Sequence, residues 1–237
     1  MSNVTANMLI YATREDIRSY SDDSSIDDRT IIFEWNNQRA LLLKRSLDIN
    51  SRIINDDLIQ DLGCVELIAA SKEECCDFSS ECKIMRTNKK IPAMIALHGS
   101  VGGMTRVGSI DKHYRNYSVV TYEKAMYSGK GRASKFAIYA YRMNDYVYLI
   151  SGNPMMYRQK YINIRGLIAD PELASTFNTC DSDPCYTRDS PYPITADMIP
   201  IIQELVKQRI LSRYMAPTDT SNNSNDDTDS ATVKQSK

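Results

Sequence analysis

The sequence is poor in the residues on which most enzyme and metal sites depend. Its 237 residues include two histidines, His98 and His113, and one tryptophan. Two imidazoles leave little room for histidine-based acid–base catalysis or for a metal site built on several histidines. There is no G-x-S-x-G nucleophile motif. There is also no P-loop, because Met104 stands where the lysine after the last loop glycine is required. The sequence therefore argues against an enzyme.

Long apolar runs are also missing. Hydrophobic residues make up 42% of the chain and the mean hydropathy is -0.42, with no run near the ~18 residues that cross a bilayer. The start of the chain, Met1–Thr5, has no basic stretch followed by an apolar core. We therefore expect no membrane span and no secretory signal. Charged residues make up 25%, so the balance is that of a soluble globular protein.

The six cysteines form no recognisable ligand pattern. Because no secretory signal is expected, we predict reduced thiols. Zinc can be imagined at Cys75, Cys76 and Cys82, or at Cys180 and Cys185, but neither group has the paired C-x2-C spacing of a zinc site. We predict no metal and no other cofactor, and cysteines that serve as packing or loop thiols. They stand at positions 64, 75, 76, 82, 180 and 185.

Charge is strongly segregated along the chain, although the net charge is only -1. Residues 1–82 hold 8 Lys and Arg against 16 Asp and Glu, a net -8. Residues 83–166 hold 15 against 3, a net +12, and residues 167–237 hold 6 against 11, a net -5. The basic centre can face nucleic-acid phosphates or the acidic segments of a neighbouring copy. A merely solvated surface is the third interpretation.

Six basic residues of the central segment are the candidate site. Basic and aromatic residues alternate in Lys112–Tyr117, a pattern found in nucleic-acid-binding proteins, but alternating aromatics are also typical of strand packing. Lys130–Phe136 lacks the aromatic that follows the glycine in the RNA-recognition signature, so sequence-specific recognition is not indicated. We assign no catalytic residue. We predict that the following residues face a subunit interface or phosphates: Arg106, Lys112, Arg115, Lys130, Arg132 and Lys135.

Three segments predict helices. The first is Asn7–Tyr20, and the second starts at Asp27-Asp28, where negative charge suits the helix dipole, and runs to Leu47. The third follows the Cys180–Pro193 loop, with Thr195 as its cap and its end near Tyr214. Asp56-Asp57 is a further helix start.

Apolar spacing predicts which faces of the two longer helices are buried. In the second helix Arg39, Lys44 and Arg45 fall off the apolar face, and Trp35 is expected as a core anchor. The expected buried faces are Ile31, Trp35, Leu42, Leu43 and Leu47 in the second helix and Met198, Ile201, Ile202, Leu205 and Val206 in the third.

The middle of the chain predicts strands, because it is rich in Tyr, Val and Ile. Phe136, Ile138 and Ala140 are expected to share one face of a strand, and Asn144-Asp145 to form a hairpin turn. The glycine-rich stretch His98–Gly108 is interpreted as a mobile loop. The predicted strands cover residues 64–70, 83–86, 117–122, 135–142, 146–150 and 161–165.

These elements predict an α+β fold, a helical bundle with an inserted small antiparallel β domain and a disordered C-terminal tail. The tail is rich in Asp, Asn, Ser and Thr, so it cannot offset the entropy of ordering. The predicted parts are an N-terminal helical part at 1–62, the inserted β domain at 63–169, a Pro-rich loop with a closing helix that completes the helical part at 170–216, and the tail at 217–237.

Landmarks across most of the chain resemble one family. Their motifs are moderately specific, and their order carries the resemblance more than any single one. The chain resembles the head-to-tail connector ring proteins of crAss-like tailed phages, which are virion structural proteins. The landmarks are Ser21–Arg29, Cys64–Leu67, Cys75-Cys76, Cys82, Arg86, Lys89–Pro92, Tyr192–Pro200, Pro217–Asp219 and Asn222-Asn223.

The resemblance implies a small adaptor without catalytic activity. Such a protein forms a closed ring, commonly dodecameric, that docks to the portal protein and extends the channel for double-stranded DNA toward the tail. Its other partners are further connector or tail proteins, and it binds DNA without sequence specificity. The implied location is the neck or tail region of the virion, assembled in the host bacterial cytoplasm. The alternative is a nucleic-acid-binding accessory phage protein that is not part of the particle.

Overall fold

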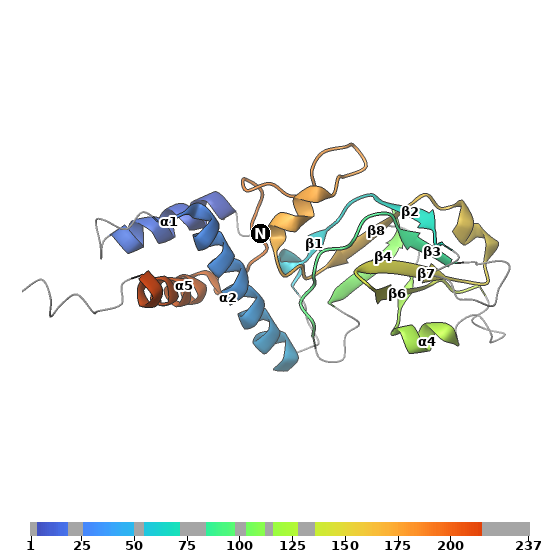
Figure 1. Cartoon of the computed structure of the whole chain (residues 1–237), viewed down its shortest axis with the longest axis horizontal. Helices are drawn as coiled ribbons and strands as arrows, with labels where there is room; N and C mark the ends of the chain where they lie inside the picture. Colours follow the sequence, from blue (N-terminus) through green and yellow to red (C-terminus); the bar gives the residue numbers. More distant parts are fainter. Residues whose placement is uncertain are drawn as a thin grey trace, which may run out of the picture.

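The computed structural model places three helices at one end of an elongated molecule and a curled β-sheet at the other (Figure 1). The predicted tail, 217–237, lies outside the described residues, and the four predicted domain boundaries stay a prediction. No helix in the described part is both long and apolar enough to cross a membrane. The structure describes residues 4–18, 26–49, 55–71, 84–97, 103–111, 116–127 and 136–214.

The three predicted long helices are confirmed, and they pack on one another, but the third begins at Ile199, so Thr195 is not its cap. Buried polar groups tie them together. Thr13 accepts a hydrogen bond from Trp35 Nε1 at 2.9 Å, which joins the first helix to the second. Glu34, only 1% exposed, forms ion pairs with Arg209, at 3.1 Å, and with Arg213 of the third helix. The helices are α1 (Ala6–Arg18), α2 (Asp28–Ile49) and α5 (Ile199–Tyr214).

Two predictions about helix faces are wrong. Arg39, expected off the apolar face of α2, is fully buried, because α2 lies between the other helices and the sheet and is covered on several sides. Ile201 and Leu205 of α5 are 52% and 37% exposed, although Ile202 and Val206 are fully buried as expected. A helix that packs on one side buries a narrow stripe, so residues beside that stripe reach solvent.

The sheet has eight strands in the order β1-β8-β2-β3-β7-β6-β5, with β4 paired to the other edge of β8. The pair β5–β6 is parallel and the others are antiparallel. β1 and β2 run along one edge of β8, where Gln60 lies opposite Gly166 and Glu66 opposite Tyr161. The strands are β1 (Gln60–Asp61), β2 (Val65–Ala69), β3 (Ile84–Thr87), β4 (Met104–Ser109), β5 (Ser118–Val119), β6 (Tyr139–Met143), β7 (Tyr146–Ile150) and β8 (Tyr161–Gly166).

The predicted fold class is therefore wrong. The molecule is mostly a curled mixed sheet with a few helices, and it is not a helical bundle carrying a small antiparallel insertion. Two strands, β1 and β5, are two residues long, so they leave almost no periodic signal in the sequence. A third strand, β4, begins within the stretch His98–Gly108, which its glycines predicted to be a loop. The sequence pattern therefore predicts fewer strands than the sheet contains.

Local predictions in the sheet meet mixed outcomes. β7 has the predicted bounds, and Asn144 and Asp145 form the predicted turn with φ values of 50° and 64°. Phe136 is 65% exposed, and the shared face expected for it does not exist, because β6 starts only at Tyr139. The predicted strand at 117–122 is also too long, since Tyr122 begins a helix. That helix, α4 (Tyr122–Met126), lies near the far end of the sheet from β1 (Figure 1).

The sheet is held by apolar side chains on one face and by tyrosines on the other. Val107, Leu149 and Ile164 are fully buried in the main core. On the opposite face Tyr141 stacks on Tyr148 with ring centres 5.3 Å apart. Three short 3-10 helices complete the fold: η1 (Asp56–Leu58) precedes the first strand, η2 (Pro154–Arg158) connects β7 to β8, and η3 (Pro171–Thr176) follows the last strand.

Candidate subunit interface

Only one of the six predicted interface residues, Arg106, lies within the described residues. Arg106 is partly buried in β4 and lies opposite Arg165 of β8 in the strand register. The other five lie outside the described residues, so a shared basic surface stays a prediction. They are Lys112, Arg115, Lys130, Arg132 and Lys135.

A cavity of about 360 Å³, which we call the acidic pocket, joins two segments that are far apart in the sequence. Residues of η1 and β1 form one wall, and the other wall is the stretch that leads from the Pro-rich loop toward α5. Three carboxylates line it, and no lysine or arginine is among the lining residues in the described part. The lining residues are Asp56, Asp57, Ile59, Gln60, Asp61, Cys185, Tyr186, Ser190, Pro191, Tyr192, Pro193 and Ile194.

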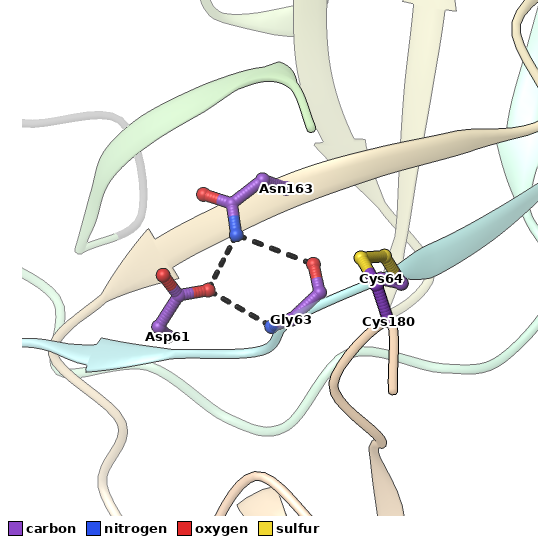
Figure 2. Close-up of a disulfide and its surroundings, with 5 residues drawn as sticks. All are labelled: Asp61, Gly63, Cys64, Asn163 and Cys180. Carbon is purple, nitrogen blue, oxygen red and sulfur yellow. Dashed lines mark hydrogen bonds between the residues drawn. A yellow bond between two sulfur atoms is a disulfide. The ribbon is translucent and has the colours of Figure 1, made fainter. Parts of the chain in front are cut away.

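Asp61 is held at the pocket by a tight turn between β1 and β2 (Figure 2). Its Oδ1 accepts hydrogen bonds from the Gly63 amide at 2.9 Å and from the Asn163 side chain. The Asn163 amide also donates to the Gly63 carbonyl at 3.2 Å. Gly63 has a φ of 62°, and a Cβ there would lie 2.5 Å from the Asn178 carbonyl oxygen, so this turn requires glycine.

A disulfide between Cys64 and Cys180 ties the wall of the pocket to the sheet, with Cα atoms 5.1 Å apart (Figure 2). The Cys64 amide also donates to Asn178, at 3.1 Å. The prediction of reduced thiols is therefore wrong for this pair. This pairing is not predictable from local sequence, because the two cysteines are 116 residues apart and meet only when the loop folds back on β2.

The carboxylates make the electrostatic potential in the pocket negative. Arg165 approaches Asp56 and Asp61 from outside the lining, with nitrogen–oxygen distances of 3.9 Å to each, so it neutralises the three carboxylates only in part. Burial and the charge of Asp61 raise the pKa of the Cys185 thiol to about 11. This thiol is therefore protonated at neutral pH and is a poor nucleophile.

Arg39 and Tyr192 attach the far wall of the pocket to α2. The Arg39 guanidinium donates to the Pro193 carbonyl at 2.6 Å and to the Ile168 carbonyl at 2.8 Å. The Tyr192 hydroxyl donates to Asn36 at 2.7 Å, and burial raises the pKa of this phenol. One helix therefore positions the pocket wall and the end of the sheet together.

The carboxylates of the pocket attract cationic groups. Carboxylates accept hydrogen bonds from lysine and arginine side chains and repel anions. No group of three His, Cys, Asp or Glu side chains in the described ranges is arranged to hold a metal ion. Sequence reasoning found Asp56-Asp57 only as a helix start, which η1 confirms. It missed the pocket, because the second wall comes from more than 120 residues further along the chain.

Comparison with known proteins places the chain in the class of phage ring proteins. The family model described as phage tail ring protein 2, from crAss-like phages, matches residues 8–228. The chain belongs to this family, which confirms the resemblance found in the sequence. It is also similar to "Ring protein 2" of Bacteroides phage crAss001, with 27% identity over 230 residues that cover 94% of this chain and 98% of the relative. The chain is thus a ring protein of a crAss-like phage and a structural protein of the virion.

Proposed function

We propose that the chain is one subunit of a head-to-tail connector ring that docks to the portal protein and extends the DNA channel toward the tail. Family membership over residues 8–228 is the observation that carries the proposal. We propose that the protein acts through contacts with its neighbours and catalyses no reaction.

Charge supports a ring made by head-to-tail contacts between copies. In a cyclic ring, one surface of each subunit meets a different surface of the next, so the two surfaces must be complementary. Residues 83–166 carry a net +12, and the acidic pocket is built from the two segments that flank them in the sequence. Opposite charges on the two surfaces orient the subunits and disfavour two-fold pairing. A ring that matches a portal is dodecameric in this proposal.

The central basic segment has a second role in the proposal, at the channel. Lysine and arginine near passing double-stranded DNA contact phosphates, and such contacts carry no sequence information. We propose that six basic residues contact either the neighbouring subunit or DNA phosphates. They are Arg106, Lys112, Arg115, Lys130, Arg132 and Lys135. We place the ring in the neck or tail region and its assembly in the host bacterial cytoplasm.

Purified particles provide the test. Quantitative mass spectrometry with labelled peptide standards measures the copies of this chain and of the portal protein in each particle. The proposal predicts equal copy numbers, together with chemical cross-links between the two proteins. If particles that package DNA lack the chain, it is instead an accessory protein outside the particle, and the connector proposal is wrong.

A further inference from the structure

We propose that a groove beside α2 is the docking site for the outward face of α5 from a second copy of this chain. The inference rests on the proposed ring function and names one contact that closes the ring. The groove holds a cavity of about 360 Å³, and its far wall is formed by the start of η3 and the residues just before it. We call it the α2 groove, because α2 contributes Arg29, Ile32, Phe33, Asn36, Asn37 and Ala40 to its lining.

The α2 groove offers an apolar surface and one unpaired cation. Phe33 is 59% exposed there, and burial against a partner would remove its ring from water. On the far wall Glu172 is already paired with Arg188, at 2.5 Å, and Asp170 accepts a hydrogen bond from an asparagine of α2 at 2.9 Å. Arg29 is exposed, and its side chain forms no ion pair with any of the described residues. A fitting partner therefore brings apolar side chains together with a carboxylate.

The outward face of α5 has this combination. Ile201 and Leu205 lie one turn apart and are 52% and 37% exposed, although the opposite side of the helix is fully buried. α5 is thus apolar on two sides, and a helix with apolar residues all round is normally covered all round. Glu204 is exposed beside them, where its partners are Lys207, 3.5 Å away, and Gln208 of the same helix. Such a surface pair is weak, so the carboxylate is available to an arginine of a neighbour.

The α2 groove and the α5 face lie on different sides of α2. Glu34 points toward α5, where it pairs with Arg209 and Arg213, whereas Ile32 and Asn36 line the groove. Residues two apart on a helix point about 200° away from each other. Figure 1 agrees, because α2 stands between α5 and the segment that carries η3.

This arrangement identifies the occupant as a second copy. The chain's own α5 packs on the far side of α2 and cannot enter the groove. Each copy can therefore offer its α2 groove to one neighbour and its α5 face to the other, which is what a cyclic ring requires. Arg29 of one copy then meets Glu204 of the next, and the apolar side chains cover one another.

Reversing the charges tests this pairing. Phage that lacks the gene is complemented with Arg29→Glu, with Glu204→Arg or with both, and the copies of this chain in each particle are counted. We expect each single variant to lose at least tenfold, because like charges then meet at every contact of the ring. The double variant restores opposite charges and should come within threefold of wild type. The matched control Glu123→Arg, at an exposed site on α4, should stay within twofold.

A photo-cross-linker then identifies the occupant directly. Benzoylphenylalanine at Ile201 should give a covalent dimer of the chain within the particle, joined to the tryptic peptide 30–39 of the second copy. Attachment to a different protein, or no attachment, overturns the inference. So does normal incorporation of a single variant, or a double variant that is no better than the singles although all of them melt at the wild-type temperature. These outcomes leave the connector proposal intact, because that proposal fails only when the wild-type chain is absent from packaged particles.

Discussion

The two ends of the molecule share one apolar core but differ in the polar groups that they bury. Both buried charged residues in the described part, Glu34 and Arg39, belong to α2 at the helical end. The sheet buries neutral polar groups such as Thr87 and Asn163 among apolar strands. Charged groups inside a protein fix specific partners, because an unpaired buried charge is very unfavourable. Apolar packing stabilises without such directionality.

This contrast explains where the acidic pocket lies. It forms where the two ends meet, with one wall on the first strand of the sheet and the other held to α2 by Arg39. The hydrogen bond from Arg39 to the Pro193 carbonyl holds this wall in place, although the wall consists of loop residues. The predictions below test the contrast, and they run from the largest expected effect to the smallest.

Replacing Arg39 with alanine should cause the largest loss of stability, about 4 kcal/mol. The change removes a fully buried side chain and leaves the Ile168 and Pro193 carbonyls without their donor. Urea unfolding measures the free energy of unfolding. The control Arg158→Ala, at an exposed site, should change it by less than about 0.5 kcal/mol. A loss below about 1 kcal/mol for Arg39→Ala would mean that the helical end does not depend on its buried charge.

Apolar burial at the sheet end predicts a loss of about 3 kcal/mol for Leu149→Ala, because a fully buried leucine of β7 leaves a cavity. Leu205→Ala makes the same chemical change in α5, where the side chain is 37% exposed, and should cost under about 1 kcal/mol. The two variants are compared by urea unfolding. Equal losses would show that Leu205 is buried in solution.

Gly63→Ala should cost about 2 kcal/mol, because φ is 62° and the added Cβ would meet the Asn178 carbonyl at 2.5 Å. Gly108→Ala is the matched control in β4, where the nearest atom would be 3.6 Å from the Cβ. We expect it to lower stability by less than about 1 kcal/mol. Thermal melting of both variants measures the difference, and a tolerant Gly63 would mean that the turn beside Asp61 is not rigid.

Thr13→Val should have the smallest effect, about 1 kcal/mol. It keeps the shape of the side chain but removes the hydroxyl that accepts from Trp35 Nε1 and donates to the Leu9 carbonyl. Trp35 is the one tryptophan of the chain, so its fluorescence reports this site directly. An unchanged emission spectrum together with unchanged stability would contradict the α1–α2 hydrogen bond.

Local periodicity explains which parts of the fold were predictable. Three long helices, the strand at Tyr146–Ile150 and the turn at Asn144-Asp145 follow from patterns within ten or twenty residues. The size of the sheet did not follow, because β1, β4 and β5 are defined by pairing with distant strands rather than by their own sequence. Tertiary pairing of this kind overrides weak local preference.

The candidate site was predictable only in its charge. The sequence separates basic and acidic segments, and this feature led to a heterologous interface as one interpretation. The pocket itself depends on contacts between residues 56–61 and 185–194, and the Cys64–Cys180 disulfide on a separation of 116 residues. Contacts between residues so far apart in the sequence leave no local sequence pattern. Arg39 was misplaced for the same reason, since the carbonyls that it binds lie on other elements.

A symmetric reconstruction of the particle's neck, at a resolution that traces the chain, tests the central claim most directly. We predict a closed ring of identical copies of this chain against the portal, with a basic surface of each copy facing an acidic surface of its neighbour. A single copy without like neighbours, or a ring whose subunit contacts join surfaces of like charge, would contradict the account.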